Sequence, residues 1–302
     1  LRACEARVWS FFRTFDKSMD KYKKHIMGDA SEEPMPLYII PDRKVSLADV
    51  REGMRNHYEG TELSMTNDPG AGAYKVPYRW RPMTFKSEGR EYFNERAIAT
   101  QQTGFVLIAQ MRSWLPDAVG GILWFGVDDA NTAVLTPMYT SITEIPECYR
   151  RGNGSMTEFS WTSAFWIHNW VANMAYNRYE PMIRDIRPVQ KELEDSYVDL
   201  VKNTDAKALE LLKSSPAQAT AYLTEVCGKV ANEATARWKK LGEYLLVKYM
   251  DGNVKKEKDG KFEENGYGQI VSPNFPGYSQ EYYDQVAKSE EAKHLEVPKK
   301  DK

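Results

Sequence analysis

The sequence lacks an excess of either charge and has no long apolar run. Among its 302 residues, 41 are lysine or arginine and 43 are aspartate or glutamate, which gives a net charge of −2. Nucleic acids and anionic membranes are bound by basic surfaces, so neither is expected as a partner. The longest apolar runs, such as residues 120–127, are far shorter than the roughly 20 residues of a membrane-spanning helix. We therefore expect a soluble protein, cytoplasmic or periplasmic.

Motifs for metals, cofactors and nucleotides are also missing. The cysteines are far apart and odd in number, which excludes a CxxC motif and argues against a complete disulfide framework. The four histidines fall in different segments, with no second ligand at the spacing of a metal site, and no HExxH, Walker or GxSxG motif is present. No metal and no cofactor is expected. The three cysteines are Cys4, Cys148 and Cys227.

Two groups of polar residues admit a functional and a structural interpretation. His168 lies between Trp166 and Trp170 in a helix-like segment, where a satisfied core histidine is more common than a ligand. Asp128 and Asp129 could be paired carboxylates for acid/base chemistry. They stand between two expected strands, however, and Asp is a standard residue of tight turns. We favour the core histidine and the turn.

Apolar periodicity predicts an α+β fold. Helical spacing marks residues 1–15, with Val8, Phe11, Phe12 and Phe15 on the apolar face, and a second helix between an N-cap at Ser46 and a stop at Gly60. Three short runs of apolar and β-favouring residues between 96 and 138 predict three strands, the last two forming a hairpin across residues 128–131.

Two long helices follow the expected strands. The first covers residues 160–200 and should be kinked or divided by Pro181 and Pro188. The second begins after an N-cap at Ser215 and ends near Tyr249, so the pair predicts a helical hairpin. We expect one domain over residues 1–250 and an extended arm over 251–302, whose last fifteen residues should be mobile. Because Leu1 already lies in a helix-like segment, we expect a fragment or a processed product.

The stretch SMTNDPGAGAYKVPYRWRP, residues 64–82, has the least ordinary chemistry. Its glycines and prolines predict a loop that allows close approach of the backbone, and it ends on Arg79 and Arg81, which bracket Trp80. Two surface arginines are by themselves most often solvated or ion-paired. Their significance depends on the segments around them.

Several segments resemble the C69 dipeptidases, the PepD family. They are HYEGT (57–61), RWRP (79–82), the run ERAIATQQTGFVLIAQMRSWLPDAVGGILWFGVDD (95–129), IPECY (145–149) and the helix start WTSAFWIHNWVANM (161–174). The resemblance extends over about residues 1–250 in a consistent order. It implies an N-terminal-nucleophile hydrolase with an αββα sandwich, in which a cysteine exposed by propeptide removal attacks a dipeptide carbonyl and its own α-amino group takes up the proton.

The resemblance also implies that the nucleophile lies elsewhere. The chain looks like the downstream, C-terminal half of the family's domain, and Cys4 has three residues ahead of it, so its α-amino group cannot serve as the base. We expect the catalytic cysteine on an upstream segment, and this chain alone to be inactive. The expected partners are a dipeptide and the upstream half of the same protein, with homo-oligomerisation left open. Half of a sandwich should also expose an apolar sheet face. The alternative is a catalytically silent interaction or scaffold module.

The resemblance assigns roles to three residues. PYRW resembles an element that places an arginine beside the nucleophile in related hydrolases, so Arg79 is the first candidate. It would hold a substrate carboxylate in a bidentate pair or lower the pKa of the thiol. Arg81 is the second candidate, as a substrate-binding residue. The sequence TNDP resembles a TNxP element whose asparagine serves an oxyanion hole, which makes Asn67 a candidate for that role.

Overall fold

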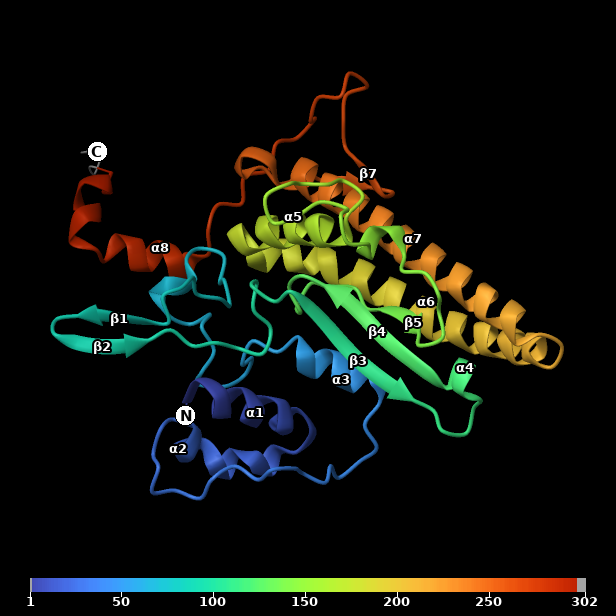
Figure 1. Ribbon diagram of the computed structural model, residues 1–302. Coiled ribbons are helices and arrows are strands. Elements are labelled where there is room, and N and C mark those ends of the chain that lie inside the picture. The colour runs from blue at the N-terminus through green and yellow to red at the C-terminus, as the bar shows by residue number, and fades with distance from the viewer. Residues whose placement is uncertain (1, 298–302) are drawn as a thin grey trace.

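The computed structural model describes residues 2–297 and has the predicted α+β fold, with long C-terminal helices (Figure 1). Three short helical segments and one longer helix form the N-terminal part. They are α1 (Arg2–Phe15), the 3-10 helix η1 (Lys17–Tyr22), α2 (Lys23–Ile26) and α3 (Leu47–Met54). None of the described helices combines the length and the apolar character needed to cross a membrane.

The first helix is where the pattern predicts it, and Phe15 of the expected apolar face is buried. Ala6 and Trp9 are fully buried, whereas Val8, expected on the apolar face, is 40% exposed. Trp9 Nε1 donates to the carbonyl of Met19 at 2.8 Å, which ties α1 to η1. The hydrogen bond of the buried indole therefore holds α1 against η1.

Helix α3 begins as predicted and ends early. Ser46 and Asp49 form a reciprocal capping box at its start. The helix ends at Met54 and not near Gly60, because Asn56 Oδ1 accepts the backbone N–H of Tyr58 at 2.7 Å. Such a local side-chain bond competes with helical hydrogen bonding. The chain turns there, and Tyr58 takes a φ of 67°.

The predicted three strands form one antiparallel sheet in the order β3-β4-β5. Its strands are β3 (Phe105–Met111), β4 (Gly121–Val127) and β5 (Thr136–Tyr139). The predicted pairing of the last two strands is confirmed, from Ile122↔Tyr139 to Phe125↔Thr136. Their connection is longer than a tight turn, since it covers residues 128–135. Two small hairpins were not predicted: β1 (Thr84–Ser87) with β2 (Arg90–Phe93), and β6 (Glu257–Lys258) with β7 (Lys261–Phe262).

Three helices form the layer beside this sheet: α5 (Ala164–Asn177), α6 (Tyr179–Leu212) and α7 (Pro216–Tyr249). The predicted division occurs at Arg178, which leaves Pro181 in the first turn of α6, where a missing N–H costs no helical bond. Pro188 does not divide the helix, because α6 continues through it to Leu212. Ser215 caps α7 as predicted, accepting the N–H of Gln218 at 3.3 Å. Figure 1 shows α6 and α7 running side by side as a hairpin.

The two faces of the sheet have different surroundings. On one side, which we call the covered face, Ile122, Trp124 and Tyr139 are each no more than 1% exposed beneath α6 and α7. On the other, which we call the open face, Phe105, Leu107 and Met111 of β3 are 62%, 43% and 70% exposed. An exposed apolar row is therefore present along β3, whereas Thr136 and Met138 of β5 are buried on the same face. The open face runs along β3, an edge strand.

The C-terminal segment is more structured than an extended arm. It contains the β6–β7 hairpin, the helix α8 (Gln280–Ala287) and the 3-10 helix η5 (Glu290–Leu295). Ser279 caps α8, a signal that the sequence interpretation missed. Lys75 pairs with Glu281 of α8 at 3.5 Å, so the segment contacts the 64–82 loop. The predicted mobility of the last fifteen residues falls partly on 298–302, outside the described residues.

Candidate active site

Arg79 is enclosed by its own loop. Its Nη2 donates to the carbonyl of Met65 and to Asp68 Oδ1, both at 2.6 Å, and its Nη1 donates to the carbonyls of Val76 and Tyr78 at 3.1 and 3.2 Å. The side chain is 14% exposed. These bonds hold the two ends of the loop together, which a point charge such as lysine cannot reproduce.

Gly70 makes room for this arginine. A Cβ on Gly70 would lie 2.7 Å from Arg79 Nε and 2.9 Å from Asp68 Oδ1, closer than van der Waals contact allows. The short 3-10 helix η2 (Pro69–Ala71) thus passes directly over the guanidinium. The small residues of this loop are therefore explained by packing, since the loop backbone surrounds Arg79 at close distance.

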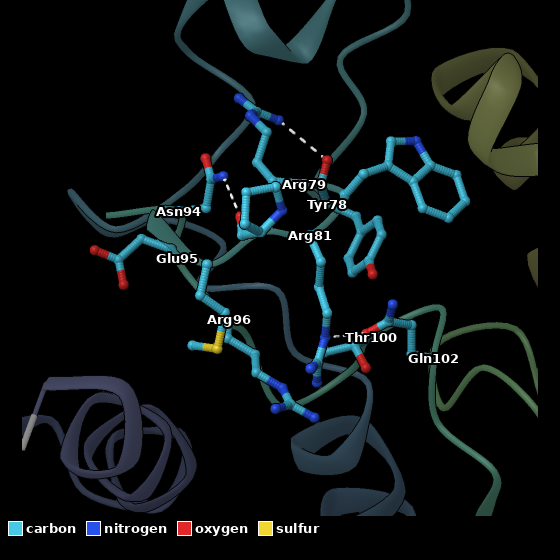
Figure 2. Close-up of a pocket in the computed structure, with 11 residues that line it drawn as sticks. Tyr78, Arg79, Arg81, Asn94, Glu95, Arg96, Thr100 and Gln102 are labelled. Atoms are coloured by element: carbon cyan, nitrogen blue, oxygen red, sulfur yellow. Dashed lines mark hydrogen bonds between the residues drawn. The ribbon is translucent and has the colours of Figure 1, made fainter. Parts of the chain in front are cut away.

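Arg81 points away from Arg79. Figure 2 shows the two guanidinium groups on opposite sides of the backbone, with Arg81 beside Gln102 and Thr100. Arg81 is exposed, and its Nε donates to Gln102 Oε1 at 3.0 Å. No carboxylate of residues 2–297 forms an ion pair with it. The hollow between Arg79 and Arg81 measures about 20 Å³, which is the size of a water molecule and not of a peptide.

Asn67 lies on yet another side of the loop. It is exposed, accepts a hydrogen bond from Thr66 Oγ1 at 3.3 Å, and lines a hollow of about 20 Å³ against α8. The three residues predicted from the sequence therefore share a loop but not a cavity. Arg79 and Arg81 adjoin the same small hollow, while Asn67 faces α8.

A much larger cleft opens on the other side of Arg81. It has a volume of about 660 Å³, and we call it the Arg81 cleft. Trp80 and Arg81 form one wall, residues 101–104 a second, and α5 a third through Phe165, Asn169 and Asn173. An open cleft of this size accommodates a small peptide.

Asp128 lies in the wall of this cleft and was not predicted as a site residue. It is 1% exposed, has a φ of 67°, and accepts a hydrogen bond from Asn169 Nδ2 at 2.8 Å. Burial raises the pKa of Asp128 to about 7, although the bond from Asn169 acts in the opposite direction. The tight-turn interpretation was wrong about the connection, which covers residues 128–135, and it did not predict the burial of Asp128, because an Asp-Asp sequence does not indicate which residues pack over it.

Asp129 anchors the loop that carries Asp128. Its Oδ2 accepts the N–H and the hydroxyl of Thr132 at 3.0 and 2.9 Å, and its Oδ1 accepts the hydroxyl of Tyr176 at 3.1 Å. Tyr176 also lies 3.0 Å from His57 Nε2. Burial raises the pKa of Tyr176 well above its usual value. This buried network fixes the position of the loop, since each of these groups would be costly to leave unpaired.

The cysteines and His168 do not belong to the cleft. Cys148 and Cys227 are buried, and burial raises the pKa of each thiol to about 11, so they are poor nucleophiles. Cys4 is exposed on α1. His168 lies in the core as predicted, stacks on Trp238, and has its pKa lowered to about 3 by burial. It is not satisfied, however, because its Nδ1 has no hydrogen-bond partner among the described residues. Within residues 2–297, no three acidic, histidine or cysteine side chains form a metal-binding group.

Comparison with known proteins identifies the family. The model of peptidase family C69 matches residues 2–192, which include the 64–82 loop, the sheet and α5. The chain belongs to peptidase family C69. Because the match ends inside α6, helix α7 and the C-terminal segment lie outside it.

Curated relatives carry dipeptidase names. The chain is 26% identical over 233 residues to a probable dipeptidase B of Lactococcus lactis subsp. lactis strain IL1403, covering 75% of this chain and 44% of the relative. It is 26% identical over 245 residues to a probable dipeptidase of Latilactobacillus sakei, covering 75% and 46%. It is 27% identical over 133 residues to a probable dipeptidase of Salmonella dublin, covering 44% and 25%. The chain thus spans about half the length of the first two relatives.

Proposed function

We propose that the chain is the downstream part of a cysteine dipeptidase whose N-terminal cysteine nucleophile lies on an upstream segment of the same protein. The observation that carries this proposal is the family C69 match over the segments that build the Arg81 cleft. The environments of the cysteines support an external nucleophile, because Cys148 and Cys227 have raised pKa values and Cys4 does not line the cleft. A dipeptide is the substrate class that the relatives' names suggest.

The loop would then supply two kinds of arginine. Arg81 has an exposed guanidinium at the edge of the cleft and no carboxylate partner among the described residues, which suits it to bind the substrate carboxylate. Arg79 would act near the nucleophile by holding the loop in shape, and the exposed Asn67 would contribute an amide to an oxyanion hole completed by the upstream segment.

The open face of the sheet supports contact with more polypeptide. Phe105, Leu107 and Met111 form an exposed apolar row on an edge strand whose outer backbone groups are available for pairing. The upstream half is the proposed occupant. The same surface also suits a catalytically silent interaction module, which is the second candidate function.

A comparison of two proteins separates these functions. The 302-residue chain and the longest gene product that contains it are each assayed for hydrolysis of simple dipeptides, with and without prior alkylation of thiols. We expect hydrolysis by the longer protein alone, its loss on alkylation, and a processed N-terminal cysteine on sequencing. Absence of hydrolysis by both proteins supports the silent module. Hydrolysis by the 302-residue chain after alkylation and Cys4→Ser overturns the cysteine mechanism.

The two arginines make a matched pair for a second experiment. In the longer protein, Arg79→Lys removes the bonds that close the loop and should lower kcat/KM by about tenfold to a thousandfold, or roughly 1.4 to 4 kcal/mol. Arg81→Lys keeps the positive charge at an exposed site and should act mainly on KM, by less than about tenfold. Steady-state dipeptide hydrolysis and thermal melts measure both. A wild-type value of kcat/KM in the Arg79 variant would show that the loop has no role in catalysis.

A further inference from the structure

Two side chains that line the Arg81 cleft each have a buried acceptor oxygen without a hydrogen-bond donor. Asp128 and Gln101 are 1% and 5% exposed, yet neither Asp128 Oδ2 nor Gln101 Oε1 receives a hydrogen bond from the described residues. Both side chains line the same cleft. A buried acceptor without a donor costs about 1 to 3 kcal/mol, and more when it is charged, so these atoms indicate a missing hydrogen-bond donor.

The orientation of the neighbouring amides explains why both atoms without a hydrogen-bond partner are acceptors. Gln101 Nε2 donates to Asn173 Oδ1 at 2.8 Å, and Asn173 Nδ2 donates to Asn169 Oδ1 at 3.0 Å. Asn169 Nδ2 in turn donates to Asp128 Oδ1 at 2.8 Å. Each amide thus donates its N–H to the next group, and this chain of hydrogen bonds ends on the carboxylate of Asp128. This direction leaves Gln101 Oε1 at the other end without a donor.

The missing donor should carry a positive charge. Asp128 is the only acidic side chain that lines the cleft, and the only basic one, Arg81, donates instead to Gln102. A primary ammonium group provides three N–H donors and a compensating charge, which offsets the cost of a buried carboxylate. A metal ion is a poorer fit, because hard cations take six or more oxygen ligands and the cleft offers one carboxylate.

We propose that Asp128 binds the α-ammonium group of a dipeptide through Oδ2, with Gln101 Oε1 as a second acceptor in the same cleft. This inference rests on the proposed dipeptidase function and assigns the amino-terminal subsite of its substrate. Arg81, on another wall of the cleft, would take the carboxylate end. The cleft therefore selects zwitterionic peptides with an unblocked amino terminus.

The electrostatics of Asp128 agree with this geometry. Burial raises the pKa of Asp128 to about 7, the bond from Asn169 and the backbone N–H of Asp129 oppose it, and the charge of Asp129 adds a smaller upward shift. An ammonium group within hydrogen-bond reach favours the ionised carboxylate and would lower that pKa again. An ammonium group at Oδ2 would thus supply the stabilisation that a buried carboxylate requires.

The test compares dipeptides with open and blocked amino termini. Titration calorimetry measures binding of Ala-Ala and N-acetyl-Ala-Ala to the 302-residue chain and to Asp128→Asn. We expect Ala-Ala to bind the wild-type chain at least tenfold more tightly than its acetylated form. Asp128→Asn should abolish this preference with little effect on the acetylated peptide. Asparagine tolerates the left-handed backbone at this position, so the variant should fold, which thermal melts check.

A matched control and a second protein sharpen the result. Asp251 has a φ of 56° and is exposed outside the cleft, so Asp251→Asn should leave the preference intact. Equal binding of both peptides by the wild-type chain, no binding of either, or a preference that survives Asp128→Asn would each overturn the inference. Hydrolysis by the longer protein is scored separately. If the preference depends on Asp128 but the longer protein does not hydrolyse dipeptides, the subsite is supported and the peptidase function is refuted. If the longer protein hydrolyses dipeptides but the preference is absent, the peptidase function is supported and the subsite is refuted.

Discussion

The covered and open faces of the β3–β4–β5 sheet are built from similar residues but meet different surroundings. On the covered face, Tyr139 joins the sheet to α6 through hydrogen bonds from its hydroxyl to Asp205 Oδ1 at 2.7 Å and to the carbonyl of Val201 at 3.4 Å. On the open face, Phe125 contacts Tyr149 at a ring separation of 5.1 Å, and β3 beyond it is exposed. On the open face, side chains are thus less buried on the edge strand β3 than on β4.

The comparison shows that an apolar strand is not necessarily a buried strand, because burial also depends on whether another element packs against each face. A strand that is apolar on both faces, such as FVLIAQM in β3, is typical of a sheet covered on both sides. In this chain one side is covered throughout, and the other is covered at β5, where Thr136 and Met138 are buried, but exposed along β3. The sheet's contribution to the free energy of folding should therefore come mainly from the covered face. The exposed apolar residues of β3 on the open face would be buried only by another surface, such as the proposed upstream half.

The largest effect is expected on the covered face, from Trp124→Ala. Trp124 is 1% exposed, and its Nε1 donates to Gln110 Oε1 at 3.0 Å. Loss of the ring leaves a cavity and an unsatisfied amide, which should lower the free energy of unfolding by about 3 to 5 kcal/mol. Urea denaturation followed by circular dichroism measures it. The control is Trp80→Ala, a 64% exposed tryptophan, with an expected change below about 0.5 kcal/mol. Equal losses would contradict the comparison.

An intermediate effect is expected in the helical layer, from the pH dependence of His168. Its pKa is about 3 in the fold and 6.5 ordinarily, so between these values the unfolded chain binds a proton that the folded chain does not. The contribution of His168 to stability then falls as pH decreases below 6.5, by about 1.4 kcal/mol per pH unit, or roughly 2 kcal/mol at pH 5. Asp128, whose pKa is raised to about 7 by burial, contributes a slope of the opposite sign below pH 7.

His168→Gln should remove the His168 contribution, because glutamine does not titrate, so the stability of the variant relative to wild type should increase as pH decreases from 6.5 to 5. The matched control is His294→Gln, since His294 is exposed near the C-terminus and should leave the slope unchanged. The measurement is the free energy of unfolding in urea at several pH values between 5 and 8. Parallel pH curves for wild type and the His168 variant would show that the stacked imidazole on Trp238 is not the cause.

Local signals in the sequence predicted the element starts. The Ser46 capping box and the Ser215 cap followed by Pro216 each act within four residues, so both helices begin where the sequence places them. The end of α3 depends on Asn56, whose Oδ1 accepts bonds from both Tyr58 and the distant Ser10. Such a partner cannot be found by periodicity, and this boundary was misplaced.

The site residues were harder to predict for the same reason. The resemblance led to the 64–82 loop, and Arg81 does line the cleft there. Asp128 and Gln101 are joined through Asn169 and Asn173 of α5, which lie about forty to seventy positions away in the chain. Their role depends on which oxygens stay unbonded after folding, and no single-sequence pattern reports that.

The smallest effect is expected on the open face, from Leu107→Ser and Met111→Ser. In the 302-residue chain both side chains are already largely in water, at 43% and 70% exposure. Each substitution should change the free energy of unfolding by less than about 0.5 kcal/mol, roughly a tenth of the effect of Trp124→Ala. In the longer gene product, where the upstream half would cover this face, each should cost more than about 1 kcal/mol, because burying a Leu or Met side chain contributes roughly 1.5 to 3 kcal/mol. Urea denaturation of both proteins measures the difference. A loss above 1 kcal/mol in the short chain would show that the open face already packs within it. A negligible loss in both would mean that the upstream half binds elsewhere, and the apolar row on β3 would then need a different partner.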